Sequence, residues 1–103
     1  ELFPKLTMIC AHFGGYDQWE EVYDVLAGKN VYLDTAYCAH RMPQKTAEKI
    51  ISRHGAEKIL FASDCPWDSP ADTIRFIERL GIPDSAKELI FSGNACQLLN
   101  VRE

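Results

Sequence analysis

The stretch that decides the fold runs from Lys58 to Trp67 and reads KILFASDCPW. A short apolar run ends in small and polar residues, Ser63 and Asp64, and a rigid Cys-Pro-Trp loop follows it. An apolar run bounded in this way is typical of a strand buried in a parallel sheet. Functional side chains in such sheets lie where the strands end, so Asp64 is a candidate site residue.

Two similar runs precede this stretch. Residues 6–11 form an apolar run that ends in His12-Phe13-Gly14-Gly15, and residues 31–35 form another that ends in Asp34-Thr35. Both are predicted strands, and the first is expected to be buried on both faces. The segments between and after the strands have apolar residues at helical spacing with capping residues at their ends. The predicted helices cover residues 17–28, 43–55, 69–81 and 83–99, the last interrupted near Gly93.

The order of elements is therefore β-α-β-α-β-α-α, and the fold class is α/β. Strands that recur every ~25–30 residues are the repeat of a parallel βα unit, so the three strands are expected side by side. Three parallel strands alone would leave two open edges and an uncovered face. The chain also begins at Glu1 without an initiator Met. We expect residues 1–103 to be one partial domain, completed by further chain or by another copy.

Composition excludes several classes of protein. The formal net charge is −4, and the Lys and Arg residues are scattered, which argues against nucleic acid or an anionic membrane as a partner. No apolar run reaches the ~18–20 residues of a membrane span, and no signal peptide is visible. The four cysteines are far apart and unpaired in sequence, so we expect them to be reduced and the protein to be cytoplasmic.

His12 and Asp64 end the first and third predicted strands. Because parallel strands end at the same edge of a sheet, both side chains are expected to open onto one cleft, with the strand from Val31 between them. An imidazole and a carboxylate that converge there can hold a metal ion and move protons.

Five segments in register make a more specific case. They are Phe3-Pro4-Lys5-Leu6, residues 10–15 (CAHFGG), residues 30–35 (NVYLDT), residues 58–67 and Gly93-Asn94-Ala95. Together they resemble the last three strands of the amidohydrolase superfamily barrel, in the amidohydrolase-related branch that includes decarboxylases, lactonases and hydratases. The resemblance implies strands six to eight of a (β/α)₈ TIM barrel.

The resemblance also implies roles for individual residues. Asp64 matches the aspartate that ligates the metal and moves a proton to or from the bound water. His12 matches the histidine that orients this water or polarises the substrate, and Trp67 matches a position at the pocket wall. The implied cofactor is a divalent metal, Zn²⁺ in preference to Mn²⁺. The His-x-His pair after strand one and the histidine after strand five are not in this chain, so only the complete barrel should hold the metal.

Structural roles compete with functional ones for several residues. His12 could be a structural strand-end histidine, and Asp64 a helix cap or a turn residue. His54, at a helix end where a positive charge suits the dipole, is expected to be structural. A solvated loop position is expected for His40, a hydrogen-bonded structural role for Asp34 and a core position for Trp19.

Three functions remain open. The first is a fragment of a metal-dependent hydrolase in which a metal-activated water attacks a carboxylic ester, lactone or amide, small molecules being the substrates. The second is a metal-dependent decarboxylase of the same superfamily. The third is a non-catalytic half-barrel that self-assembles or joins a partner subunit, with His12 and Asp64 as relics. In each, this chain alone should be inactive, and it should associate with itself or with the missing N-terminal part.

Overall fold

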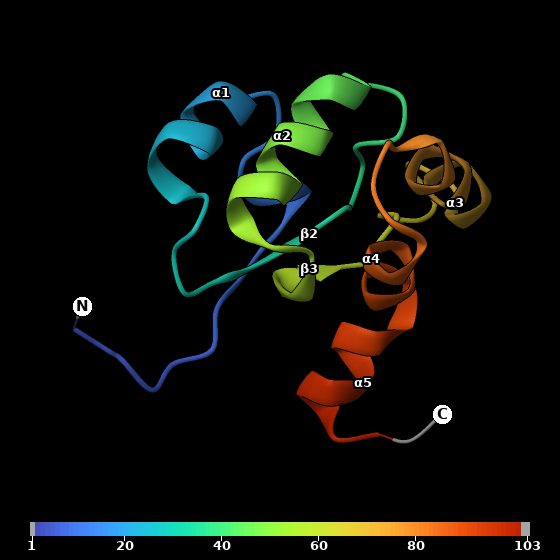
Figure 1. Cartoon of the computed structure of the whole chain (residues 1–103). Coiled ribbons are helices and arrows are strands. Elements are labelled where there is room, and N and C mark those ends of the chain that lie inside the picture. Colours follow the sequence, from blue (N-terminus) through green and yellow to red (C-terminus); the bar gives the residue numbers. More distant parts are fainter. Residues whose placement is uncertain (1, 102–103) are drawn as a thin grey trace.

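The computed structural model describes residues 2–101 and has mixed α/β architecture (Figure 1). Three short strands lie near the centre, and in Figure 1 the helices lie above them and to their right. The strands are β1 (Ile9–Cys10), β2 (Tyr32–Asp34) and β3 (Ile59–Leu60). The helices are α1 (Trp19–Glu21), α2 (Gln44–His54), α3 (Pro70–Arg79), α4 (Asp84–Glu88) and α5 (Asn94–Leu99).

The sheet has the order β1-β2-β3, and both pairs of neighbours are parallel. Ile9 lies opposite Tyr32, and Leu33 lies opposite Ile59. The predicted order, with the strand from Val31 in the middle, is therefore confirmed. Consequently, the carboxyl ends of all three strands lie at one edge of the sheet.

The first strand is not buried as predicted. Met8 is 49% exposed and Ile9 is 52% exposed, although the pattern of residues 6–11 predicted burial on both faces. That prediction was wrong for this chain because β1 pairs on one side only, with β2, among the described residues. All three strands are also shorter than predicted, since a ladder with few neighbours forms few of the hydrogen bonds that define a strand.

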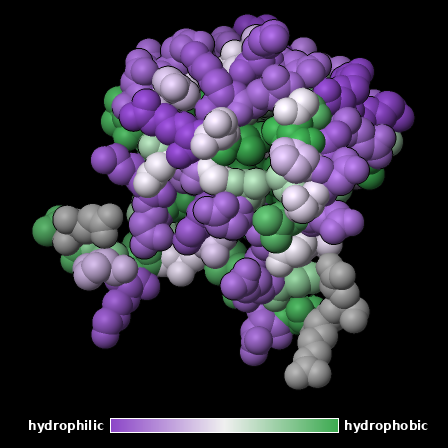
Figure 2. All heavy atoms as spheres, in the orientation of Figure 1, coloured by the Kyte–Doolittle hydropathy of each residue, from purple (hydrophilic) through white to green (hydrophobic). Residues whose placement is uncertain are grey.

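The helices bury their apolar stripes on the sheet and on one another. The core combines residues from all three βα units: Phe13, Trp19, Val22, Leu33, Cys38, Ile50, Ile59, Phe76, Ile77 and Ile90. The predicted start of α3 is confirmed, because the Ser69 hydroxyl accepts a hydrogen bond from the Asp72 backbone N–H at 3.0 Å and Pro70 follows. The face shown in Figure 2 carries mostly polar side chains, with apolar areas between them.

Two helices contain a π-helical turn. The helix that begins at α1 continues through Val22–Leu26, and the last helix continues from α4 through Leu89–Gly93 into α5. The predicted interruption near Gly93 is wrong, since Gly93 has helical dihedrals (φ −56°, ψ −45°) and ends a π-helical turn that continues into α5. No helix between residues 2 and 101 has the length and apolar character that a membrane crossing requires.

Asn94, the first residue of α5, fastens the last helix to the sheet. Its amide nitrogen donates to the carbonyl oxygens of Ala56 at 2.6 Å and Ile59 at 2.7 Å. The side chain is buried, and its oxygen has no hydrogen-bond partner in the described part of the chain. Asn94 belongs to Gly93-Asn94-Ala95, one of the five segments that carry the family resemblance.

Candidate active site

The edge where the strands end carries both residues that the sequence singled out. His12 follows β1, Tyr37 lies shortly after β2 and Asp64 follows β3. All three have left-handed backbone dihedrals, with φ of 57°, 55° and 66°. Such conformations cost on the order of 1–3 kcal/mol each for non-glycine residues, and they concentrate at functional sites. The strain therefore marks this edge as the candidate site.

The Asp34 carboxylate ties the first two strand ends together. Its Oδ1 accepts hydrogen bonds from the backbone N–H groups of His12 at 3.1 Å and Ala36 at 2.9 Å. The hydrogen-bonded structural role predicted for Asp34 is confirmed. The same contacts hold the backbone of His12 in its left-handed turn.

Thr35 ties the second and third strand ends together. Its buried hydroxyl donates to the Ala62 carbonyl at 2.8 Å and accepts from the Ala62 N–H at 2.9 Å. Further along the same two segments, the Tyr37 N–H donates to the Ser63 carbonyl at 3.2 Å. These bonds place Asp64 directly beyond a fixed strand end. Thr35 was not among the predicted site residues, because a threonine in sequence looks the same whether its hydroxyl is buried in such contacts or not.

The His12 ring is fixed by a backbone carbonyl. Its Nδ1 lies 2.9 Å from the carbonyl oxygen of Ala36, which can only accept, so Nδ1 carries the hydrogen. Nε2 is then the acceptor nitrogen of the neutral ring, and it has no partner among residues 2–101. The Trp19 indole donates to the His12 carbonyl at 3.0 Å from the core, where it was expected to lie.

Asp64 leaves its carboxylate free. Its backbone carbonyl accepts from the N–H groups of Trp67 at 2.9 Å and Asp68 at 3.3 Å, which forms the turn that the sequence suggested. The exposed carboxylate itself makes no hydrogen bond or ion pair with any residue from 2 to 101. Trp67, the predicted pocket-wall residue, is 74% exposed beside this turn.

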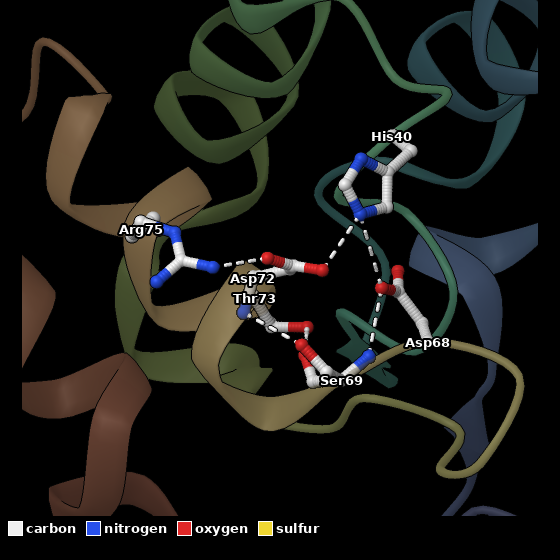
Figure 3. Close-up of polar contacts among 6 residues, drawn as sticks. All are labelled: His40, Asp68, Ser69, Asp72, Thr73 and Arg75. Carbon is white, nitrogen blue, oxygen red and sulfur yellow. Dashed lines mark hydrogen bonds and ion pairs between the residues drawn. The ribbon is translucent and has the colours of Figure 1, made fainter.

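A second cluster of ionisable groups combines two loop residues, His40 and Asp68, with Asp72 in the first turn of α3 (Figure 3). His40 Nε2 is 2.9 Å from an oxygen of Asp72 and 3.5 Å from an oxygen of Asp68. The potential ligand atoms of the three residues lie within 4.8 Å of one another, and imidazole and carboxylate groups suit a divalent cation. His40 was expected to be a solvated loop residue; its side chain is 71% exposed, but it is bonded to both acids.

The hydrogen bonds of this cluster favour a structural clamp over a metal site. Arg75 pairs with Asp72, and the Asp68 carboxylate, almost fully buried, also accepts from the Ser69 N–H at 2.8 Å. Hydrogen bonds from His40, then Arg75 and Ser69, lower the pKa of Asp72 to about 2. A cation would have to displace these donors beside a permanent guanidinium charge. The cluster therefore joins the loop after β2 to the start of α3.

His54 is the remaining histidine, and it lies away from this edge. Its Nδ1 accepts a hydrogen bond from the Gly28 N–H at 2.9 Å, and its Nε2 lies 2.9 Å from the Val31 carbonyl. Burial lowers the pKa of His54, and the Gly28 bond requires an unprotonated Nδ1. The predicted structural role is confirmed, and the unprotonated ring fulfils it through hydrogen bonds rather than through a charge on the helix dipole.

The Cys38 thiol, on the loop after β2, is not available as a nucleophile. Cys38 is buried and donates its S–H to the Ala36 carbonyl at 3.2 Å. Burial, with the charges of Asp34 and Asp68, raises the pKa of the Cys38 thiol to about 12. None of the four cysteines forms a disulfide, as expected from their spacing.

Comparison with known proteins decides the family. A sequence model of the amidohydrolase family (Amidohydro_2) matches residues 1–101. The chain belongs to the amidohydrolase family. A comparison with curated proteins finds no match.

Solved structures share the fold. The 2,6-dihydroxybenzoate decarboxylase from Rhizobium is similar over 96% of this chain and 37% of its own, with a TM-score of 0.78 at 18% identity. The dihydroxybenzoic acid decarboxylase from Polaromonas sp. JS666, with bound manganese and the inhibitor 2-nitroresorcinol, is similar over 96% of this chain and 35% of its own. Its TM-score is 0.74 at 23% identity. A provisionally assigned amidohydrolase from Staphylococcus aureus is similar over 97% of this chain and 36% of its own, with a TM-score of 0.71 at 24% identity. The chain thus spans little more than a third of each structure.

This amidohydrolase chain can supply part of a metal site. Asp64 and His12 Nε2 offer a carboxylate oxygen and an imidazole nitrogen, both without partners in the described residues. These donor types suit a divalent metal, but a zinc site usually needs three or four protein ligands. The donor set therefore fits the metal that the family implies, provided that further ligands come from outside residues 2–101.

Proposed function

We propose that residues 1–103 form strands six to eight of a (β/α)₈ barrel whose complete form is a metal-dependent hydrolase of carboxylic esters, lactones or amides. The observation that carries the proposal is the arrangement at the strand ends. His12 and Asp64 follow two parallel strands at one edge, and each leaves a potential ligand atom free. In α/β barrels this edge holds the active site.

Each residue has a proposed role. Asp64 would hold a divalent metal, Zn²⁺ or Mn²⁺, together with ligands from the rest of the barrel. A bound metal supplies a nucleophile near neutral pH, because it lowers the pKa of a coordinated water. Asp64 would take the proton of the attacking water, His12 Nε2 would orient that water or the substrate carbonyl, and Trp67 would line the pocket wall.

A decarboxylase is the second candidate. Two of the similar structures are decarboxylases of dihydroxybenzoates, and one of them binds manganese and a planar aromatic inhibitor. In this reaction the substrate loses carbon dioxide, and Asp64 would return a proton to the carbon that is left with the electron pair. The same two strand-end residues serve both reactions, so the arrangement in this chain supports either.

The expected partner is the rest of the barrel. Apolar residues of the first strand, Met8 and Ile9, are exposed along an edge that has no neighbour among the described residues. A preceding strand from the same protein, or a second copy, would cover them. Four cysteines without a disulfide support a reducing compartment such as the cytoplasm.

The test is product analysis on the protein that contains this chain. Purified protein loaded with Zn²⁺ or Mn²⁺ is incubated with lactones, esters, amides and hydroxylated aromatic acids. Ring opening or acid release without carbon dioxide supports the hydrolase, whereas carbon dioxide release supports the decarboxylase. Upstream coding sequence with a His-x-His motif after an apolar strand is expected. A start codon immediately before Glu1, with no turnover, would support the non-catalytic module instead.

A further inference from the structure

The His12 ring is held by more than its one hydrogen bond. The Ala36 carbonyl that accepts from Nδ1 also accepts from the buried Cys38 thiol, which keeps this oxygen in place. Turning the ring over about its Cβ–Cγ bond would put a carbon where Nδ1 lies and would break the contact. The ring orientation therefore determines which nitrogen carries the hydrogen.

Two tyrosines pack edge-on against this ring. Tyr16 lies with its ring centre 5.9 Å from that of His12 at an interplanar angle of 75°, and Tyr37 lies at 6.4 Å and 70°. The two tyrosine rings stack on each other at 5.4 Å and 26°. They come from the loops after β1 and β2, so both strand ends contribute to the packing.

Both tyrosines are themselves anchored. Tyr16 packs edge-on against the buried Trp19, with ring centres 5.9 Å apart. The Tyr37 N–H donates to the Ser63 carbonyl, immediately before Asp64. Each tyrosine is nonetheless more than a third exposed, at 38% for Tyr16 and 39% for Tyr37. A stacked pair held by a ring contact at Tyr16 and by a backbone hydrogen bond at Tyr37 is placed to restrict the side chain beside it.

We propose that Tyr16 and Tyr37 are positioning residues that hold neutral His12 as the Nδ1–H tautomer, with Nε2 as the acceptor nitrogen at the strand-end edge. The inference rests on the proposed function in one respect, since it gives His12 Nε2 a water or a substrate to accept from. A histidine that orients water by accepting its hydrogen bond needs this tautomer. The tyrosines act through His12 and need not touch the substrate.

His54 supplies an internal reference with the opposite tautomer. Its Nδ1 accepts from the Gly28 N–H, so its hydrogen lies on Nε2, which donates to Val31. In their neutral forms, these two histidines therefore carry their hydrogens on different ring nitrogens. The contrast can be measured without any substrate.

The experiment is long-range ¹H–¹⁵N correlation of histidine side chains at about pH 8, in the complete protein labelled with ¹⁵N at histidine. Loss of signals in His12→Asn and His54→Gln identifies each ring. We expect a protonated Nδ1 for His12 and a protonated Nε2 for His54. Tyr16→Leu and Tyr37→Leu should each convert His12 to a mixture of tautomers. Tyr37→Phe, which keeps the aromatic ring, should retain the single tautomer of the wild type. Tyr23→Leu, which removes an aromatic ring that contacts Lys49 and Arg53, is the matched control.

The outcomes separate this inference from the proposed function. A wild-type His12 protonated on Nε2 overturns it, whatever the protein catalyses. Unchanged His12 signals in both leucine variants, with His54 signals showing a folded protein, also overturn it. A protein that lacks turnover but shows the expected tautomers and their loss supports the positioning role and refutes only the proposed chemistry.

Discussion

The carboxylate of Asp34 accepts a hydrogen bond from the backbone N–H of His12, 22 residues earlier in the chain, at 3.1 Å. The same oxygen accepts a hydrogen bond from the Ala36 N–H, and the Ala36 carbonyl accepts one from Nδ1 of the His12 ring. Asp34 thus holds both the backbone of His12 and the residue that orients its ring. It lies at the end of β2, between the two strands that carry His12 and Asp64.

Asp34→Ala should weaken the fold at this point. Hydrogen bonds to charged groups contribute about 1.5–3 kcal/mol each, and Asp34 is half-buried, so we expect the free energy of unfolding to fall by about 2 kcal/mol. The measurement is urea unfolding of the wild type and the variant. Asp24→Ala, which removes an exposed carboxylate, should change it by less than about 0.5 kcal/mol. Equal stabilities for Asp34→Ala and Asp24→Ala would contradict the role given to Asp34.

His54 should make stability depend on pH. Its pKa is lowered in the folded state by burial, against a usual value of about 6.5 in the unfolded chain. The unfolded state then binds the proton more tightly, so this contribution is fully present above about pH 6.5 and is lost as the pH falls from there through the lowered folded-state pKa. Glu57 and Lys58, the charged groups that act on the ring, oppose each other. Thermal unfolding from pH 8 to pH 5 should show the loss.

The control for this pH dependence is His54→Gln. Glutamine can keep a hydrogen bond to Gly28 or Val31 but does not titrate in this range. The His54→Gln variant should be less stable than the wild type at pH 8. Its stability should also change less than that of the wild type between pH 7 and pH 5. A wild-type curve that is as flat as that of His54→Gln would show that His54 is not held neutral.

The open edge of β1 should drive association of the isolated chain. Leu6, Met8 and Ile9 are about half exposed or more, and contiguous apolar surface of this kind marks an interface or an aggregation site. We expect light scattering of residues 1–103 to give a mass above that of a monomer, and Met8→Lys to lower it. Val25→Lys, at another exposed apolar position, should have less effect. A folded wild-type monomer at high concentration would contradict this prediction.

Much of the fold could be predicted because its signals are local. The apolar run before Asp64, the Ser69-Pro70 helix start and the strand spacing each reflect short-range physical chemistry, and the parallel order β1-β2-β3 follows from them. The burial of residues 6–11 was predicted wrongly for the opposite reason. Apolar composition shows that a strand suits burial, but the covering partner lies outside the described residues.

The site could be predicted only in part. His12 and Asp64 stood out because each ends a strand, whereas Thr35 and the clamp of His40, Asp68 and Asp72 depend on contacts 27 to 32 residues apart. The unprotonated state of the His54 ring could not be predicted from the sequence for a similar reason. Its place at a helix end is visible in the sequence, but the Gly28 N–H that requires an unprotonated Nδ1 comes from another loop.

The most direct test of the central claim combines kinetics and metal analysis on Asp64→Asn in the complete protein. Asparagine keeps the shape but removes the charge and the basicity. General acid–base catalysis alone is typically worth ~10²–10⁴-fold in rate, and a lost ligand also weakens metal binding. We expect turnover to fall by at least this factor and metal content to fall with it. His12→Asn should lower the rate with less loss of metal, and Asp24→Asn should change neither. An Asp64→Asn protein with wild-type turnover and full metal occupancy would contradict the account.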